Sequence, residues 1–344
     1  MEKKLIHKSI VLEEALSIPE RIEIFNKTDK NNYNLIANKI KDKKIKHIVT
    51  VARGTSDCAA LFASYSFAKN IGITTYSLPP SLITLENSKF DFSNTLIIII
   101  SQSGLSKDLI ESERAARSMG GETLIITNNL NSPLINTADN FFYINAGKEN
   151  SIAATKTFVL TILTIIKLIG VIKSNRKLFY NLNNLSNFLN KDQIKEWNYN
   201  IIKRDVTSGF IISRGVGAAL ASEMSLKFKE LCQEQIESFS SAEVMHGPKS
   251  LIQNSFKLFT LTLNDLSSQG IAYDTKKIKE NTNLVYEISS NSKLHNFHYM
   301  QNDSLELEPL IIMAKFYPWI INYTMAKGLN PDNPRYLTKV THTL

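Results

Sequence analysis

Cysteine is scarce in this chain, and its two isolated cysteines exclude the architectures that depend on that residue. Cys58 and Cys232 lie far apart in the sequence, so they form neither a disulfide framework nor a CxxC metal site. No apolar run approaches the roughly 20 residues that span a bilayer. The opening residues, MEKKLIHKSIVLEEAL, carry no apolar leader. We therefore expect a soluble, cytoplasmic globular protein with reduced thiols, no membrane contact and no metal.

The sequence also lacks the glycine-rich signatures of nucleotide binding and any concentrated basic stripe. No GxGxxG follows the first predicted strand, and GxxxxGK[ST] occurs nowhere. The net charge of +8 comes from dispersed lysines, as in KIKDKKIK at residues 39–46. Such dispersion is more typical of compositional bias than of a nucleic-acid surface. We expect no nucleic-acid partner, although the positive charge is compatible with a small anionic ligand.

Short runs rich in Ile, Val, Thr and aromatic residues recur along the chain, mostly separated by segments of helical length. They fall at residues 46–54, 73–78, 94–104, 122–129 and 140–147, and again at 208–215, 234–240, 256–263, 283–289 and 296–300. Apolar strands that alternate with helices indicate parallel sheets covered on both faces. Arg53 and Arg214, each between a strand and a helix, lie 161 positions apart (214 − 53), which indicates an internal duplication.

The pattern predicts an α/β protein of two tandem domains, each a flavodoxin-like five-stranded parallel sheet flanked by helices. A chain of 344 residues is long for one core. We expect a helical lead-in at 1–29, a first domain at 30–190, a second at 191–329 and a proline-rich tail at 330–344.

Hydroxyl side chains follow two neighbouring strands of the first predicted sheet. The chain reads SQSGLS at 101–106 and ARGTSD at 52–57, and AATK at 153–156 opens an apolar helix. One serine-rich turn is more often a plain helix cap. Two such turns at adjacent strand ends instead favour a phosphate site, because helix N-termini and hydroxyls both donate to anions.

The second half supplies residues suited to acid–base chemistry. The segment ASEMSLKFKELC places Glu223, Lys227 and Glu230 on one face of a helix. A solvated, ion-paired face is the usual meaning of that pattern, but the apolar residues between them indicate a packed helix. His246 precedes Gly-Pro and so lies on a loop, and imidazole titrates near physiological pH.

In this order, GTS, SQSG, AATK, LKFKE, HGP and NPRYLTKV resemble the SIS (sugar isomerase) domain family, and in particular the isomerase half of glucosamine-6-phosphate synthase. The resemblance covers nearly the whole chain. It implies a sugar-phosphate cradle made by the side chains of Thr55, Ser56, Ser101, Gln102, Ser103 and Ser106 and by the backbone of Gly54, Ala153, Ala154 and Thr155.

The same resemblance implies roles for four further residues. Glu230 would move a proton between carbons 1 and 2 of the open-chain sugar, with Lys227 near the reacting carbons. His246 would promote ring opening from across a homodimer interface. Lys339 would meet the carbonyl at carbon 2 and could form an imine with it. Pro331 and Pro334 favour an extended tail, which we expect Tyr336, Leu337 and Val340 to anchor along the substrate crevice.

Departures from the synthase point to a related reaction. The chain begins MEKKL without the N-terminal cysteine of a glutaminase, so we expect no ammonia release from glutamine. Leu105 and Leu109 stand where the synthase has an acidic residue and a threonine. SQSGLSKDL, FSSAEVMHGP and KVTHTL look closer to stand-alone SIS-type glucosamine-6-phosphate deaminases.

The expected activity is conversion of glucosamine 6-phosphate to fructose 6-phosphate and ammonia, without a cofactor. A plain aldose–ketose phosphate isomerase, a deglycase acting on another sugar phosphate, and a non-catalytic phosphosugar sensor remain open. A sensor needs only the cradle, so the joint presence of Glu230, His246 and Lys339 weakens that alternative.

Overall fold

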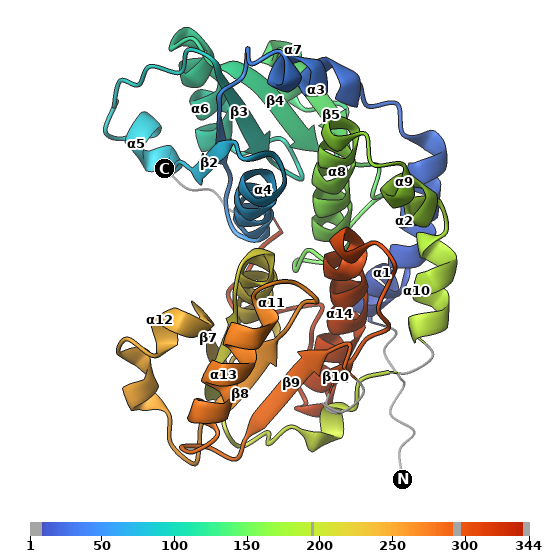
Figure 1. Ribbon diagram of the computed structural model, residues 1–344, viewed down its shortest axis with the longest axis vertical. Coiled ribbons are helices and arrows are strands. Elements are labelled where there is room, and N and C mark those ends of the chain that lie inside the picture. Colours follow the sequence, from blue (N-terminus) through green and yellow to red (C-terminus); the bar gives the residue numbers. More distant parts are fainter. Residues whose placement is uncertain (1–8, 194–195, 292–296, 340–344) are drawn as a thin grey trace.

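The computed structural model describes residues 9–193, 196–291 and 297–339, and it contains two five-stranded parallel sheets, one in each half of the chain (Figure 1). The first has the strand order β2-β1-β3-β4-β5, and the second β10-β9-β8-β6-β7. The strands of the first sheet are β1 (His47–Val51), β2 (Thr74–Ser77), β3 (Thr95–Ile100), β4 (Glu122–Thr127) and β5 (Asn140–Tyr143). Those of the second are β6 (Ser208–Ser213), β7 (Gln235–Ser240), β8 (Lys257–Leu261), β9 (Val285–Ser289) and β10 (Phe297–His298).

This arrangement confirms the predicted fold class of two tandem parallel α/β sheets flanked by helices. Every predicted strand is present. The last is the shortest, and residue 296 of its predicted run lies outside the described residues.

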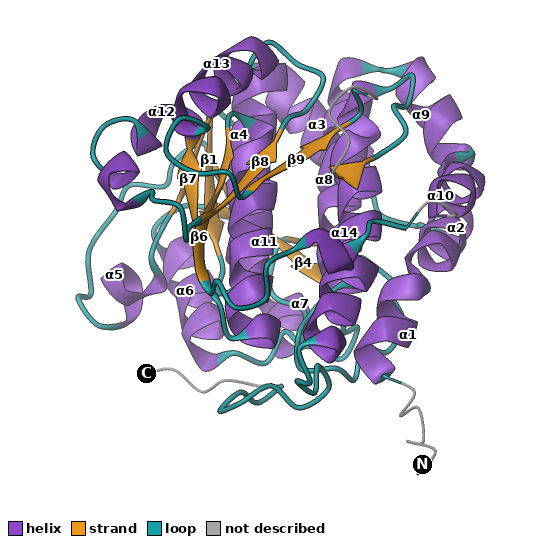
Figure 2. Cartoon of the chain, turned by 90° about the horizontal axis from the view of Figure 1, so that it is seen from below, coloured by secondary structure: helices purple, strands orange, loops and turns teal. Residues whose placement is uncertain are grey.

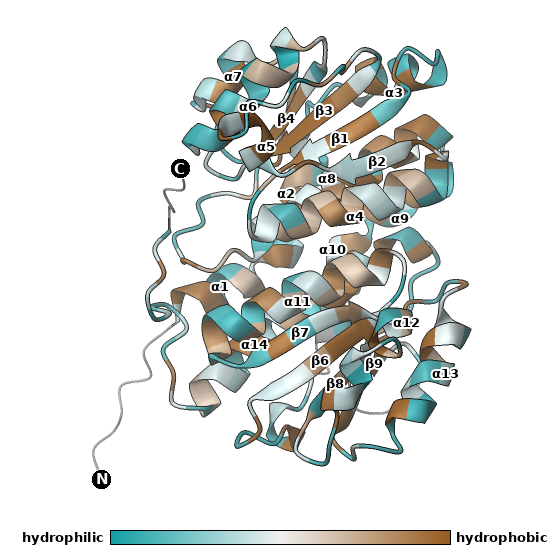
Figure 3. Ribbon diagram, turned by 90° about the vertical axis from the view of Figure 1, so that its left-hand side faces the viewer, coloured by the Kyte–Doolittle hydropathy of each residue, from teal (hydrophilic) through white to brown (hydrophobic). Residues whose placement is uncertain are grey.

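Four long helices form a central layer between the two sheets (Figure 3). They are α4 (Thr55–Ile71), α8 (Lys156–Lys173), α11 (Val216–Cys232) and α14 (Glu308–Ala326). Almost every residue of α8 and α14 is buried. Their apolar side chains join the inward faces of both sheets in one continuous core. Full burial of each such side chain contributes about 1.5–3 kcal/mol before entropy is counted, so this layer holds the two halves together.

Shorter helices cover the outer face of each sheet. The helices α5 (Pro80–Thr84), α6 (Lys107–Ser118) and α7 (Pro133–Thr137) enclose a second apolar cluster on the first sheet. The helices α12 (Ser241–Val244) and α13 (Ser268–Ile278) do the same for the second sheet. Three 3₁₀ turns occupy Tyr199–Ile201, Pro248–Leu251 and Leu305–Leu307.

Helices from the start and the middle of the chain lie together along one side of the molecule (Figure 2). They are α1 (Ile10–Leu16), α2 (Ile18–Thr28), α9 (Arg176–Asn183) and α10 (Leu185–Gln193), with α3 (Tyr33–Lys41) packed on α8. Among the described residues, no helix combines the length and the apolar character needed to cross a membrane.

The internal duplication is visible in backbone geometry. Gly54 precedes α4 with φ 55° and ψ −132°, and Gly215 precedes α11 with φ 58° and ψ −136°. The arginines before these glycines pair equivalently, Arg53 Nε with Asp108 Oδ2 at 3.0 Å and Arg214 Nη2 with Asp274 Oδ2 at 2.6 Å. The two halves therefore repeat the same strand–turn–helix unit down to its ion pair.

Candidate active site

A cavity of about 750 Å³ opens at the carboxyl ends of β1, β3 and β4. Turns after β1 and β3, the loop before α8, the C-terminal end of α11 and the chain tail all contribute to its wall. This is the edge of a parallel sheet at which ligands bind. The predicted site residues that line it are Gly54, Thr55, Ser56, Ser101, Gln102, Ser103, Ser106, Ala154, Glu230 and Lys339.

The turn after β3 is built to leave donors free for a ligand. Ser101 Oγ accepts from the Gly104 amide at 3.1 Å, which folds the turn back on itself. Gly104 has φ 63°, and a Cβ there would come within 2.0 Å of Ser132 Oγ, so only glycine fits. Ser106 precedes α6 without a side-chain capping bond. Its hydroxyl is therefore available to an anion, whereas the Leu109 amide in the first turn of α6 already donates to Asp108 Oδ1 at 2.9 Å.

The N-terminus of α4 provides the second hydroxyl-bearing turn. Gly54 precedes the helix, and no side chain caps it. Ser56 lines the cavity, whereas the Thr55 hydroxyl accepts from Lys227 Nζ at 2.9 Å. Thr55 therefore also joins the first half of the chain to the second.

A buried cluster of alternating charges lies on α11. Lys227 Nζ is 2.6 Å from Glu230 Oε2 and 3.2 Å from Glu223 Oε1. Tyr317 donates its hydroxyl to Glu223 Oε1 at 2.9 Å. The side chains of Glu223 and Lys227 are fully buried, while that of Glu230 is 22% exposed and reaches the cavity. Glu230 is thus the one member of this triad that a ligand can touch.

Burial and charge set the protonation of the cluster. Burial raises the pKa of Glu223 to about 7, because the attraction of Lys227 only partly offsets burial and the Glu230 charge adds to it. For Lys227, burial acts to lower the pKa, but the two carboxylates outweigh it and raise the pKa above its ordinary value. Lys227 therefore stays cationic. It is enclosed beneath Glu230 and does not line the cavity, which differs from the expected place near the reacting carbons.

Glu149 is a site residue that sequence reasoning missed. It accepts from the Thr155 amide at 3.0 Å, from Thr157 Oγ1 at 2.6 Å and from Gln102 Nε2 at 2.9 Å. Its side chain is buried, and Lys339 Nζ lies 3.7 Å from its Oε2. The only signal in the sequence is a lone acid in AGKEN, just before the apolar helix.

The tail runs along the cavity, as expected: Leu337, Thr338 and Lys339 all line it. Lys339 Nζ is buried and has no hydrogen-bond partner among the described residues. Tyr336 is 93% exposed, so its expected anchoring role is wrong, whereas Leu337 is 39% exposed and lines the cavity. Val340 lies outside the described residues.

Asp332 holds the tail instead. Its carboxylate accepts from the Val11 amide at 2.8 Å, the Ile10 amide at 3.0 Å and Ser9 Oγ at 3.1 Å. These are the first groups of α1, whose amides have no partner within the helix. A polar cap on α1 therefore fixes the path of the tail.

Three further predicted residues do not line the cavity. His246 is exposed on the turn after α12, where its amide donates to the Glu243 carbonyl at 3.0 Å. Ala153 is buried, and Thr155 is directed to Glu149. The described residues contain no cluster of three or more His, Cys, Asp or Glu side chains arranged to hold a metal ion.

Comparison with known proteins matches one family model to the first half of the chain. Residues 40–169 match the model of the SIS domain. The chain is 29% identical over 312 residues to the glutamine–fructose-6-phosphate aminotransferase (isomerizing) of Fusobacterium nucleatum, covering 86% of this chain and 51% of that protein. The enzyme of the same name from Sulfurisphaera tokodaii is 26% identical over 315 residues, covering 86% of this chain and 50% of that protein. The chain thus spans about half the length of the curated relatives it matches.

Solved structures share the fold over nearly the whole chain. A candidate phosphosugar isomerase from Silicibacter pomeroyi DSS-3 superposes with a TM-score of 0.85 at 28% identity, covering 94% of this chain and 100% of the other. The C-terminal domain of glucosamine-fructose-6-phosphate aminotransferase from Francisella tularensis gives 0.79 at 22% identity, covering 97% and 100%. The architecture of two tandem α/β domains, each built on a five-stranded parallel sheet, is therefore shared with these structures.

The expected closer resemblance to the deaminases is not supported. Glucosamine-6-phosphate deaminase from Thermotoga maritima gives a TM-score of 0.76 at 17% identity, covering 97% of this chain and 100% of the other. Both values are below those for the aminotransferase domain. The deaminase is one structural neighbour among several.

Proposed function

We propose that this chain of two SIS-fold domains is a phosphosugar isomerase, and that its substrate is a 2-amino-sugar 6-phosphate from which it releases ammonia. The observation that carries the proposal is the shared cavity. A carboxylate (Glu230) and an amine without a hydrogen bond (Lys339 Nζ) face the same space as two hydroxyl-rich helix starts. Proton transfer between carbons 1 and 2 needs a base beside those carbons. The hydroxyl-rich helix starts would bind the phosphate of the same sugar.

In this mechanism the phosphate lies against the turns at Ser56 and Ser101–Ser106, and carbons 1 and 2 lie toward Glu230 and Lys339. Glu230 takes the proton from carbon 2 of the open-chain aldehyde, and the electron pair moves to the carbonyl oxygen. The resulting enolamine carries developing negative charge on oxygen, which the ammonium group of Lys339 stabilises.

Glu230 then returns the proton to carbon 1 while the nitrogen lone pair forms the double bond to carbon 2. A proton passes from that nitrogen to the oxygen on carbon 1, which leaves a hydroxyl at carbon 1 and an imine at carbon 2. Water adds to that imine, the carbon–nitrogen bond breaks, and ammonia and the 2-keto sugar phosphate leave. Lys227 does not touch the sugar in this scheme. Its ammonium group pairs with the Glu230 carboxylate from the buried side of the helix. The negative charge of Glu230 is therefore compensated whenever this residue is deprotonated.

His246 remains our proposed ring-opening residue only in an assembly of two chains. Because it is exposed and outside this chain's cavity, it would act in the site of a second copy.

The test is incubation of the protein with a panel of 2-amino-sugar 6-phosphates, with ammonia and ketose phosphate measured separately. We expect both products in equal amounts from at least one substrate, and neither from the Glu230→Gln variant. Interconversion of an amine-free aldose and ketose phosphate, without ammonia from any amine, would identify a plain isomerase. Tight sugar-phosphate binding without either reaction would instead identify a sensor.

A second measurement tests Lys339 directly. In the scheme above Lys339 acts as an ammonium group, so borohydride should trap no sugar on it; trapping on the wild-type lysine would show that this lysine itself forms an imine with the sugar carbonyl. Arginine keeps the charge but cannot form an imine, so Lys339→Arg should not be trapped.

A further inference from the structure

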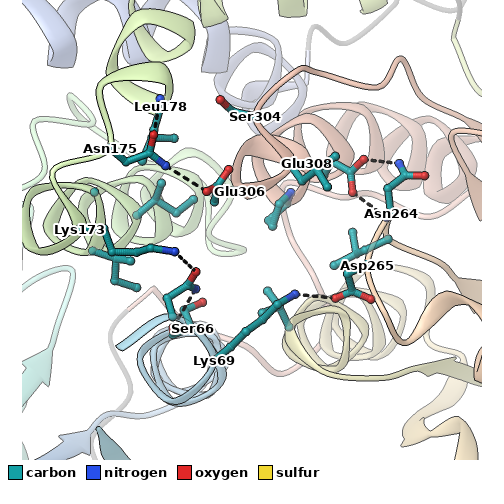
Figure 4. Close-up of a pocket in the computed structure, with 18 of the residues that line it drawn as sticks. Ser66, Lys69, Lys173, Asn175, Leu178, Asn264, Asp265, Ser304, Glu306 and Glu308 are labelled. Atoms are coloured by element: carbon teal, nitrogen blue, oxygen red, sulfur yellow. Dashed lines mark hydrogen bonds and ion pairs between the residues drawn. The ribbon is translucent and has the colours of Figure 1, made fainter. Parts of the chain in front are cut away.

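A second cavity of about 660 Å³ lies between the two halves of the chain (Figure 4). Its wall comes from the C-terminal ends of α4 and α8, the start of α9, the N-terminal ends of α11 and α14, and the loop after β8. No residue that lines it lines the candidate active site. Its size is that of a small-molecule site.

The duplication relates this cavity to the candidate active site. Val216 at the start of α11 corresponds to Thr55 at the start of α4, 161 positions earlier (216 − 55). By the same offset, Lys69 near the end of α4 corresponds to Glu230 near the end of α11 (230 − 69). The second cavity is thus built from the same parts as the first, but a lysine stands where the first has its carboxylate.

One end of this second cavity, at the N-terminus of α11, corresponds to the predicted phosphate site. This end does not favour an anion. Asp265 follows β8, and its Oδ2 lies 3.9 Å from where a Cβ on Gly215 would be. Lys69 Nζ pairs with the same oxygen at 2.8 Å. The N-terminus of α11 therefore already faces a carboxylate of the protein itself.

Three other carboxylates line the cavity: Asp303, which is exposed, and Glu306 and Glu308. Glu308 is 1% exposed; it accepts from the Asn264 backbone amide at 2.9 Å and from Asn264 Nδ2, and it also hydrogen-bonds with Tyr299. Glu306 accepts from Asn175 Nδ2 at 3.2 Å. Neither Glu306 nor Glu308 forms an ion pair with any described residue. Burial raises the pKa of Glu308, and a cation beside this carboxyl would lower the pKa again by stabilising the charged form.

Lysines without a carboxylate partner lie at the rim. Lys173 Nζ donates to Asn70 Oδ1 at 3.3 Å, and Lys177 also lines the cavity. Ser66, Asn70 and Ser304 add hydroxyl and amide groups to the lining, and Phe62 adds an apolar side chain. Figure 4 shows Lys173 and Asn175 on one side of the opening and Glu308 and Asn264 on the other.

We propose that this second cavity binds an amino-sugar phosphate, with the ammonium group at Glu306 and Glu308 and the phosphate at Lys173 and Lys177. The other polar side chains of the lining, Ser66, Asn70 and Ser304, would bind sugar hydroxyls. The apolar lining residues would contact the C–H face of the sugar. The helices α4, α8 and α11 each have one end in this cavity and the other in the candidate active site. A ligand here would therefore act on the same helices that carry Thr55 and Glu230.

The proposal is tested by binding stoichiometry, with 2-amino-2-deoxyglucitol 6-phosphate as the probe. This open-chain amine has no carbonyl, so it cannot be turned over, and calorimetry can count its sites. We expect two sites per chain in the wild type, and one site per chain for fructose 6-phosphate, which has no amine. Glu306→Gln should weaken one class of site by about tenfold or more, since a charge-assisted bond contributes about 1.5–3 kcal/mol.

Matched variants separate this cavity from the candidate active site. Glu280→Gln makes the same chemical change on an exposed turn, and it should keep both sites. Ser106→Ala should weaken only the other class of site. Lys173→Gln, at an exposed position, repeats the test should Glu306→Gln fold poorly.

One site per chain in the wild type, or two unchanged sites in both Glu306→Gln and Lys173→Gln, would overturn the proposal. The count does not depend on turnover. A protein that releases no ammonia yet binds two probes per chain would refute the proposed reaction and support the second site.

Discussion

Replacing Lys227 by methionine tests whether the buried charges of α11 hold the two halves of the chain together. The substitution keeps most of the side-chain length but removes the cation between Glu223 and Glu230, as well as the bond to Thr55. Removal of one partner from a buried ion pair costs about 3–5 kcal/mol, because the other charge stays buried without compensation. We expect a loss of that size in the free energy of unfolding at pH 8, measured by urea denaturation.

The matched control is two residues away on the same helix. Lys229 pairs with Glu237, and both side chains are exposed, at 41% and 44%. An exposed pair contributes about 0–1 kcal/mol, so Lys229→Met should change the free energy of unfolding by no more than that. If the two variants lose stability equally at pH 8, the buried ion pairs of Lys227 do not hold the two halves of the chain together.

The same cluster predicts how stability depends on pH. The native pKa of Glu223 is raised to about 7 from 4.5, so between these values the native state holds a proton that the unfolded state has lost. The Glu223 contribution to the free energy of unfolding therefore falls as pH rises through this window. Glu223→Gln should remove that slope. The loss in Lys227→Met should be smaller at pH 6 than at pH 8, because a protonated Glu223 no longer needs the lysine.

Four other variants test separate parts of the candidate active site. Glu230→Gln should abolish turnover with little change in sugar-phosphate affinity; an equal loss of both would give Glu230 a structural role. Ser106→Ala should raise the Kd for a sugar phosphate about tenfold or more, and an unchanged Kd would place the phosphate elsewhere. Asp332→Asn removes the charge that caps α1 and should lower kcat far more than Tm, since its larger effect is on Lys339. His246→Ala and Glu230→Gln should each be inactive alone, but regain activity when the two are mixed and refolded together. Absence of that rescue would argue against His246 acting across an interface.

Much of the fold could be predicted because strand and helix patterns are local. The apolar strands of the first half each end in Gly, Ser, Asn or Pro, and the repeat of Arg-Gly at Arg53 and Arg214 pointed to the duplication. The hydroxyl-rich turns were predictable for the same reason. A parallel sheet brings the carboxyl ends of neighbouring strands to one edge, whatever the rest of the chain does.

Residues whose roles depend on distant partners were not predictable. Glu149 is defined by donors from Gln102 and Thr157, and its own neighbours in the sequence are unremarkable in type. The helical spacing of Lys227 could not reveal that α4 packs over it. The tail has apolar side chains at Tyr336 and Leu337, yet a carboxylate capping a helix more than 300 positions away fixes its path.

The short helix α1 acts as a spacer between two parts of the candidate active site. Its first amides hold the tail through Asp332, while Glu14, near its other end, accepts from the amides of Asn150 and Ser151 beside Glu149. Seven residues of helix span only about 10 Å, and each residue turns the helix by about 100°. An insertion or deletion of one residue within α1 would therefore swing Glu14 away from its loop and change the separation of Glu149 and Lys339. The length of α1 is thus constrained by the distance between Glu149 and Lys339, although neither residue lies on this helix.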